Sequence, residues 1–222
     1  MITEKLRDYI PPRYSWPLLA GALLTNMAVY NGARFINRSR THYILSLPLD
    51  DRIPLCTPFV VIYLLAFVQW AAGYVLAARE SREVCHDIAV GDIFAKLICF
   101  VIFLMVPTTL IRPEVVGSSI FDRLTRLVYS LDAPDNLLPS IHCLESWMCL
   151  RGSLMIKKAP SWYIPASFIF TILVCASTVF MKQHLLPDIP TGILAAEIGL
   201  WLARRLPGKE SRVYPRTKLT DG

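Results

Sequence analysis

The sequence predicts an all-α fold: a polytopic membrane bundle of six transmembrane helices, with an interfacial amphipathic helix between the third and the fourth. Two features of the composition lead to this expectation. Hydrophobic residues make up 54% of the 222 residues and charged residues only 18%, against about half and about a quarter in soluble domains. The apolar residues also gather in separate stretches, close to the roughly 20 residues that a membrane-crossing helix needs. We therefore expect lipid around most of the chain.

Charge and cysteine usage argue against other classes of protein. The net charge of +6 comes from short clusters of Lys and Arg between the apolar stretches, not from one long basic face. The six cysteines lack CxxC spacing and lie mostly inside apolar stretches, where a thiol behaves as a small hydrophobe. We expect no nucleic-acid partner, no metal, no cofactor and no disulfide framework.

The first two spans follow a mixed-charge leader. The leader, residues 1–15, is expected in the cytoplasm, and the first span covers residues 16–36. The second span, 54–78, is more apolar and has Pro54 and Pro58 near its start. Proline is tolerated in a first helical turn because the N–H groups there have no partner within the helix.

The third span and an amphipathic segment come next. A charged loop at 79–92 precedes the third span, 93–109, which ends close to Arg112. Residues 113–139 are too polar to cross, yet their apolar residues recur at steps of one, three and four. This pattern is typical of a helix lying flat in the interface, and equally of an ordinary amphipathic connector. The apolar residues are Ile120, Phe121, Leu124, Leu127, Val128 and Leu131.

The fourth span, 140–156, is short and carries His142, Glu145 and Arg151. Ionisable groups at that depth are costly and usually face a protein interior or a water-filled cavity. We therefore expect a buried site beside this helix. For Glu145, an internal hydrogen bond is the simpler interpretation.

Two further spans, 162–181 and 189–206, complete a membrane domain at residues 16–206, and a basic cytoplasmic tail follows at 207–222. Lys and Arg are more frequent in the leader, the second and fourth loops and the tail than in the alternate segments, with Lys96 included among the former. Because cytoplasmic segments carry this excess, both termini are expected in the cytoplasm, with the protein in the plasma (inner) membrane.

This orientation brings three polar groups that are distant in the sequence to the extracytoplasmic side. Two cations and a hydroxyl suit a phosphate, because Arg offers a planar fork of donors and Lys a point charge. Two histidines beside a carboxylate suit proton transfer and covalent chemistry near neutral pH. The candidate residues are Arg112, Ser140, His142, Lys182, His184 and Asp188.

Three sequence blocks carry a resemblance to a known family: Arg112-Pro113, Pro139-Ser140-Ile141-His142 and His184-x-x-x-Asp188. They resemble the signature blocks of the type 2 phosphatidic acid phosphatase (lipid phosphate phosphatase) superfamily, and the six-span architecture is similar too. The resemblance covers residues 55–206. It implies a metal-independent enzyme that hydrolyses a lipid phosphate or diphosphate monoester at the outer membrane face.

The resemblance also implies a role for each candidate residue. His184 would attack phosphorus to form a phosphohistidine, with Asp188 holding its imidazole in the reactive tautomer. His142 would protonate the leaving group. The phosphoryl oxygens would be held by Arg112, Ser140 and Lys182.

Three positions depart from the family pattern. Met105 stands where the first block usually has Lys, and Thr178 where an Arg normally precedes the last block; Lys182 is the candidate replacement for that charge. Ile141 between Ser and His is similar to the inositol phosphorylceramide synthase branch, which transfers a phospho-headgroup. A membrane phosphotransferase that moves a headgroup between lipids or to a polyol, and a catalytically degenerate membrane protein, are therefore alternatives.

Single residues also have simpler interpretations. Ser140 can serve only as an N-cap, and Lys182 can simply extend to the interface. Pro187 and Pro190 can distort the turn that aims Asp188. A metal site formed by the two histidines and Asp188 is a further alternative, which the adjacent cations oppose.

The expected partners are a lipid phosphate substrate and the membrane lipids. Phosphatidic acid, a polyprenyl diphosphate, phosphatidylglycerophosphate and an inositol phospholipid all present a phosphate at the interface. No residue pattern in the sequence indicates which lipid tail the substrate carries or which oligomeric state the protein adopts.

Overall fold

The computed structural model describes residues 10–157 and 159–206. These residues form seven α-helices with a few 3-10 turns and no strand, so the predicted all-α class is confirmed. Residues 1–9 of the predicted leader and the predicted tail, 207–222, lie outside the described residues. The helices are α2 (Trp16–Asn37), α3 (Val60–Glu80), α4 (Arg82–Met105), α5 (Ile120–Leu131), α6 (Ile141–Ser153), α7 (Tyr163–Phe180) and α8 (Asp188–Arg205).

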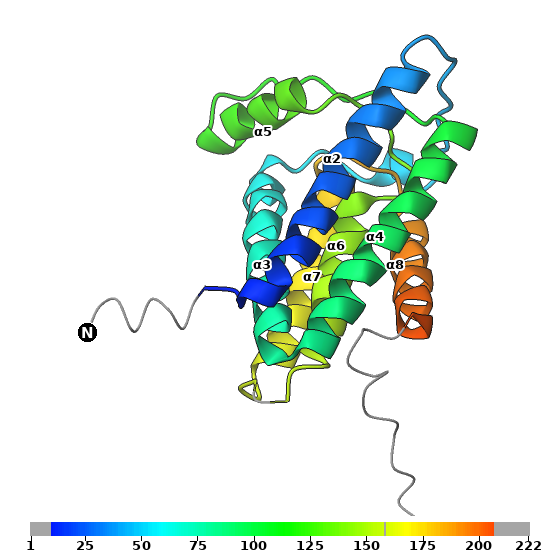
Figure 1. The fold of residues 1–222 in the computed structure, drawn as a ribbon. Coiled ribbons are helices and arrows are strands. Elements are labelled where there is room, and N and C mark those ends of the chain that lie inside the picture. Colours follow the sequence, from blue (N-terminus) through cyan, green and yellow to red (C-terminus); the bar gives the residue numbers. More distant parts are fainter. Residues whose placement is uncertain (1–9, 158, 207–222) are drawn as a thin grey trace, which may run out of the picture.

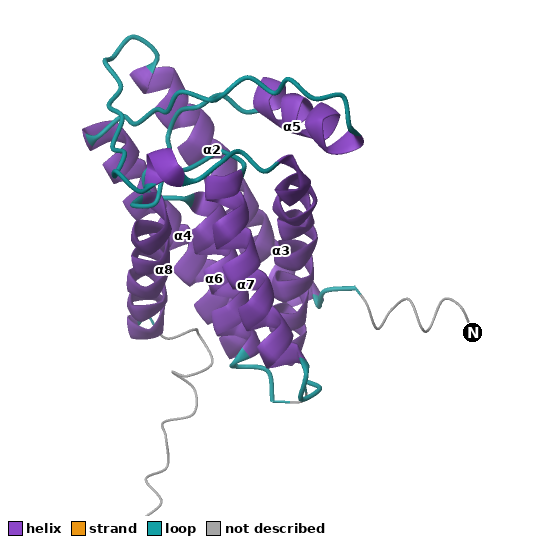
Figure 2. Cartoon of the chain, turned by 180° about the vertical axis from the view of Figure 1, so that it is seen from behind, coloured by secondary structure: helices purple, strands orange, loops and turns teal. Residues whose placement is uncertain are grey.

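Helix α4 stands at the centre of the bundle. It packs against α2, α3, α6 and α8, while α7 packs against α3 and α6 on the side that Figure 2 turns to the viewer. Burying a helix among several partners requires apolar side chains on most of its faces. The core accordingly contains Ile88 and Phe103 of α4, Leu144 and Met148 of α6, and Leu200 of α8, all almost fully buried.

The helix connections separate into two ends of the bundle (Figure 1). The connections from α2 to α3, from α4 through α5 to α6, and from α7 to α8 lie at one end. The short α3–α4 and α6–α7 connections lie at the other, where α2 begins and α8 ends. Arg112, Ser140 and His184 therefore share one end of the molecule.

The predicted charged loop at 79–92 is wrong, because most of it is helical. Helix α3 continues to Glu80 and α4 already begins at Arg82. Ser81 between them is extended, and its side chain accepts a hydrogen bond from the N–H of Val84 at 3.1 Å, which caps α4. Charged side chains at the end of α3 and the start of α4 lower the local hydropathy, so hydropathy alone does not reveal these helical residues.

Lys96 does not belong to a loop either. It lies within α4, is 2% exposed and contacts Asp92 and Glu145. Without it, the leader, the second and fourth loops and the tail still hold 14 Lys and Arg residues in the sequence, against 8 in the alternate segments. The excess of Lys and Arg that predicts the orientation is therefore smaller but still present.

Helix α5 forms over the residues whose apolar periodicity predicted it. Ser119 and Asp122 make a capping box at its start, which satisfies two N–H groups there. Val128 on its inner face is buried, whereas Ile120 and Leu131 are 61% and 76% exposed. The helix lies across the end of the bundle that holds the candidate residues, and it contacts α3.

Within the described residues, three helical segments are long and apolar enough to cross a membrane: Thr57–Glu80, Arg82–Met105 and Tyr163–Phe180. The fold is therefore compatible with a membrane protein. The predicted first, fourth and sixth spans coincide with helices α2, α6 and α8, which fall short of this criterion of length and hydropathy.

Glycine permits a close approach of α4 and α8. A Cβ atom at Gly199 of α8 would overlap the carbonyl oxygen of Gly91 and lie 2.8 Å from the backbone nitrogen of Ala95, both in α4. Backbone atoms cannot move aside as the end of a flexible side chain can. Small residues serve the same purpose where membrane helices cross closely.

We predict that Gly199→Ala lowers the free energy of unfolding by about 1 to 3 kcal/mol, as overpacking of a tight core does. The measurement is thermal unfolding of the purified protein in detergent. Gly152→Ala is the matched control, because its Cβ would meet Ile88 Cδ1 at an ordinary 3.6 Å. Equal midpoints for the two variants would contradict the assigned helix contact.

Candidate active site

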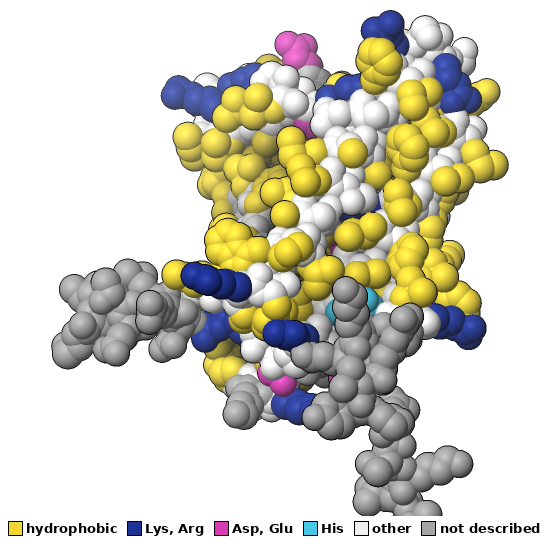
Figure 3. All heavy atoms as spheres, viewed as in Figure 1, with side chains coloured by type: hydrophobic (Ala, Val, Ile, Leu, Met, Phe, Trp, Pro, Cys, Tyr) yellow, Lys and Arg dark blue, Asp and Glu magenta, His cyan; other side chains and the backbone are white. Residues whose placement is uncertain are grey.

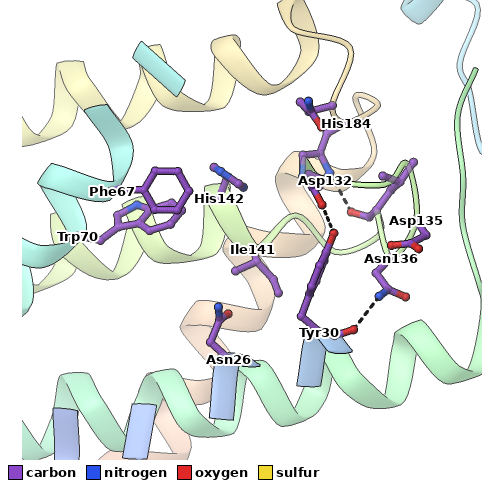
Figure 4. Close-up of a pocket in the computed structure, with 12 residues that line it drawn as sticks. Asn26, Tyr30, Phe67, Trp70, Asp132, Asp135, Asn136, Ile141, His142 and His184 are labelled. Carbon is purple, nitrogen blue, oxygen red and sulfur yellow. Dashed lines mark hydrogen bonds between the residues drawn. The ribbon is translucent and has the colours of Figure 1, made fainter. Parts of the chain in front are cut away.

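A cavity of about 170 Å³ lies at the end of the bundle where the long connections gather. In Figure 4, the rings of His142 and His184 lie on one side of it, and Asn26 and Tyr30 of α2 on the opposite side. Aromatic side chains of α3 bound a third side, and the segment after α5 a fourth. The lining residues are Asn26, Tyr30, Phe67, Trp70, Asp132, Asp135, Asn136, Leu137, Ile141, His142, Gln183 and His184.

His184 lies in the turn between α7 and α8, and its protonation pattern follows from its partners. Nδ1 lies 3.0 Å from the carbonyl oxygen of Leu137 and 3.1 Å from Asp188 Oδ2. Both atoms are acceptors, so Nδ1 is the nitrogen that carries the hydrogen. In the neutral ring, Nε2 then holds the lone pair.

Asp188 is the first residue of α8 and is 1% exposed. Its Oδ2 also accepts a hydrogen bond from the N–H of Leu185 at 2.9 Å, and its own carbonyl accepts one from the N–H of Ser140 at 3.0 Å. The contact between His184 and Asp188 thus forms although Pro187 precedes α8 and Pro190 lies in its first turn. Asp188 joins the turn, α8 and the start of α6.

The pKa of His184 lies above its ordinary value of 6.5. Burial of the ring lowers the pKa, because it disfavours the charged form, but the hydrogen bond to Asp188 and the charge of that carboxylate outweigh it. The ring is charged below this raised pKa and neutral above it. A nucleophilic Nε2 is accordingly available only on the alkaline side.

His142 lies in the first turn of α6 and is held by aromatic rings. Tyr63 stacks on it with ring centroids 4.2 Å apart, and Trp70 and Phe67 present edge contacts at 5.0 and 5.7 Å. The centroid of His184 lies 6.2 Å away. Its Nε2 is buried and has no hydrogen-bond partner, so this nitrogen is left for a bound group.

Arg112 is connected to the site by its hydrogen bond to Gln183. Its Nη1 donates to the carbonyl of Asp132 at 2.6 Å, and its Nη2 to Gln183 Oε1 in a very short contact. Because Oε1 is taken by the guanidinium, the amide nitrogen of Gln183 is the group left to face the cavity. That nitrogen is buried and unpartnered, as is Arg112 Nε.

Gln183 was not among the residues predicted from the sequence. Its position next to His184, within a polar island between two apolar helices, is the signal that could have found it. The side chain is 2% exposed and lines the cavity. A buried amide donor suits the oxygens of a phosphate.

The structure does not bring the side chains of Ser140 and Lys182 into the cavity lining. Ser140 is fully buried, and its Oγ accepts a hydrogen bond from the N–H of Cys143 at 3.3 Å, which caps α6. Lys182 Nζ donates to the carbonyl of Asp50 at 2.9 Å, in the α2–α3 connection. Asp50 also accepts from the N–H of Leu186 at 2.8 Å, so these contacts hold the turn that carries His184.

Two carboxylates that the sequence reading missed line the cavity beyond α5. Asp135 makes a two-pronged contact with Arg34 of α2, and Asp132 lies 3.4 Å from the same guanidinium. The hydroxyl of Tyr30 donates to Asp132 in a very short contact. One arginine thus contacts both acids on this side.

Four buried polar atoms without a partner belong to residues that line this cavity. Gln183 Nε2 is a donor, the Oδ1 atoms of Asn26 and Asn136 are acceptors, and His142 Nε2 can act as either. Buried polar groups in proteins are normally hydrogen-bonded. Their gathering here indicates a site for a ligand that supplies acceptors to Gln183 and donors to the asparagines.

The chain matches no family model, and no curated protein or solved structure is significantly similar to it. No group of three or more His, Cys, Asp and Glu side chains within residues 10–157 and 159–206 is placed to hold a metal ion.

We predict that Asp188→Asn lowers the pKa of His184 relative to the wild-type protein, because burial then acts without the opposing carboxylate. The measurement is an NMR titration of histidine-labelled protein in detergent, with the His184 signal assigned by its loss in His184→Gln. His42 is the internal reference, since it lies outside this cavity. An unchanged His184 titration would contradict the assigned pair.

Proposed function

We propose that the chain is an integral membrane phosphatase that hydrolyses a lipid phosphate or diphosphate monoester through a phosphohistidine on His184. The observation that carries the proposal is the pair of His184 and Asp188. This pair fixes the hydrogen on Nδ1 and leaves Nε2 as the nucleophilic nitrogen in a buried cavity. The resemblance of the three sequence blocks to the type 2 phosphatidic acid phosphatase superfamily supports the same chemistry.

In this proposal α2, α3, α4, α7 and α8 cross the membrane. Their 18 to 24 residues span about 27 to 36 Å as helices, comparable to a hydrocarbon core of about 30 Å. Helix α6 has 13 residues, about 20 Å, and lies mostly buried, so its partners shield it from lipid. Figure 3 supports this placement, since hydrophobic side chains cover the middle of the visible face and Lys and Arg lie mostly towards its ends.

The six helices that correspond to the predicted spans alternate in direction, so the cavity and α5 occupy the side opposite the start of α2 and the end of α8. The positive-inside rule puts that side outside the cytoplasm. Helix α5, with Ile120 and Leu131 exposed, lies in the interface in this proposal, beside the cavity. A lipid could then present its phosphate to the cavity while its tails stay in the bilayer.

The first chemical step transfers the phosphoryl group to the protein. His184 Nε2 forms a bond to phosphorus as the bond from phosphorus to the leaving oxygen breaks, and His142 gives that oxygen a proton. The two rings line the same cavity, with their centroids 6.2 Å apart. Asp188 stabilises the positive charge that develops on His184.

The second step restores the enzyme. Water attacks phosphorus, its proton passes to the neutral His142, and the bond between phosphorus and Nε2 breaks. The amide of Gln183, aligned by Arg112, stabilises the phosphoryl oxygens in both steps. Ser140 contributes by position, since its cap and its bond to Asp188 fix the start of α6.

A second candidate function, transfer of a phospho-headgroup between lipids or to a polyol, is favoured by the acidic side of the cavity. Asp132, Asp135 and Asn136 offer acceptor oxygens there. A phosphate dianion is repelled by two carboxylates, whereas hydroxyl groups can donate to them. A sugar or polyol hydroxyl in place of water would make the second step a transfer.

We predict that His184→Ala reduces phosphate release from lipid phosphates by at least about a hundredfold, because it removes the nucleophile. His42→Ala, at the same end of the molecule but outside this cavity, is the matched control and should retain activity. The assay is release of inorganic phosphate by the purified full-length protein in detergent. Turnover unchanged in His184→Ala would overturn the site.

A companion assay separates the two candidate functions. With a substrate labelled on phosphorus, hydrolysis yields free phosphate, whereas transfer yields a labelled lipid or polyol phosphate without it. In either case we expect activity to persist in EDTA and to be inhibited by vanadate, which mimics the phosphoryl group. Loss of activity in EDTA, with recovery on adding a divalent cation, would sink the histidine mechanism.

A further inference from the structure

A cluster of ionisable side chains lies inside the bundle, and the proposed reaction does not use it. Lys96 of α4 lies 2.7 Å from Asp92 Oδ2 on the same helix and 2.6 Å from Glu145 Oε1 of α6. The hydroxyl of Tyr74 of α3 donates to Glu145 Oε2 at 2.7 Å, and Lys96 also reaches the carbonyl of Ala22 of α2 at 3.3 Å. Residues of four helices thus contribute to one buried cluster.

The cluster is close to the candidate active site. On three helices, a cavity-lining residue and a cluster residue are separated by one helical turn, so they lie on the same helix face. The cluster is the deeper of the two layers, on the side where α2 begins and α8 ends. The paired residues are Asn26 and Ala22 on α2, Trp70 and Tyr74 on α3, and His142 and Glu145 on α6.

The charges of the cluster do not balance. The side chains of Asp92, Lys96 and Glu145 are 0%, 3% and 8% exposed, and two carboxylates face one ammonium. Within the described residues, Lys96 is the one cation in an ion pair with either acid. Burying an uncompensated charge costs several kcal/mol, and more so where lipid surrounds the bundle.

No other neighbour removes the imbalance. The remaining titratable groups that act on these acids are the Tyr74 hydroxyl of α3 and the thiols of Cys99 in α4 and Cys149 in α6. All three are neutral near neutral pH unless strongly perturbed towards ionisation. On the α2 side, Lys96 donates a hydrogen bond to the carbonyl of Ala22, and Gly199 and Leu200 of α8 lie close to Gly91 and Ala95 of α4. A single proton is the smallest ligand that neutralises the cluster.

The hydrogen bonds show where that proton fits. Both carboxylate oxygens of Glu145 have donors, from Lys96 and Tyr74. Asp92 Oδ2 accepts from Lys96, but Asp92 Oδ1 is buried without any hydrogen-bond partner. An anionic oxygen would be left unsolvated there, whereas a hydroxyl oxygen carries far less charge.

The structure assigns Asp92, Lys96 and Glu145 as an intramembrane proton-binding site, in which Asp92 carries one exchangeable proton at neutral pH. The site is distinct from the histidine pair and requires no phosphoryl transfer. The layer of Asn26, Trp70 and His142 separates it from the cavity by one helical turn, which makes the cavity its nearest source of protons.

Infrared spectroscopy of the purified full-length protein tests this assignment. At neutral pH we expect the carbonyl band of a protonated carboxylic acid, a shift of that band in D₂O, and a further shift when aspartate carboxyl groups carry ¹³C. Asp92→Asn should remove the band. Glu197→Gln is the matched control, because Glu197 pairs with Arg151 at the bundle surface, and it should keep the band.

Other outcomes would overturn the assignment. No band in the wild-type protein would exclude a bound proton, and a shift with ¹³C-labelled glutamate instead of aspartate would exclude Asp92 as its carrier. Loss of the band in sodium but not in potassium salts at fixed pH would identify a metal cation as the ligand. The labelled wild-type spectra decide the question even if Asp92→Asn fails to fold.

Discussion

Asp188 is the residue through which the two histidine-bearing segments meet. Its side chain accepts hydrogen bonds from the ring of His184 and from the backbone of the same turn, and its carbonyl holds the N–H of Ser140. Ser140 caps α6, whose first turn carries His142. One buried carboxylate therefore sets the tautomer of the first ring and, through the backbone, the place of the second. Because a buried carboxylate is costly without such partners, each of these contacts also stabilises the others.

Buried polar groups need partners, and each cation of the site meets this requirement with different contacts. Arg112 and Lys182 mainly contact carbonyl and amide oxygens of the protein itself, and so they align the segments around the turn. Arg34 is occupied by the two carboxylates beyond α5. Among the residues that line the cavity, the groups left unpaired are neutral: amides and an imidazole. A cavity of this kind can distinguish a ligand by where its donors and acceptors lie, and net charge contributes less.

Features that depend on residues close together in the sequence could be predicted, whereas contacts between residues far apart in the sequence could not. The helices follow from local apolar patterns, and α5 covers the apolar residues of segment 113–139 that repeat with helical spacing. The start of α4 was missed because charged side chains such as Asp87 interrupt the apolar pattern while Ser81 supplies an effective cap. The pairing of His184 with Asp188 is local in the sequence, and it was expected from the resemblance of the third sequence block. The partners of Lys182 and Arg112 were not, since Asp50 and Gln183 are distant in the sequence and only the packed fold brings them near.

The ion cluster within the bundle has a consequence for biogenesis. Helix α4 carries its own i to i+4 pair, Asp92 and Lys96, so the helix can enter the bilayer as a segment whose charges cancel. Glu145 arrives later, on α6, and brings the additional acid into a bundle that already contains the ammonium group. The order of synthesis thus matches the order in which the charges can be accommodated. A bundle assembled without α6 would hold a complete ion pair, and in the proposed assignment the proton would be taken up only once α6 has brought Glu145 to Lys96.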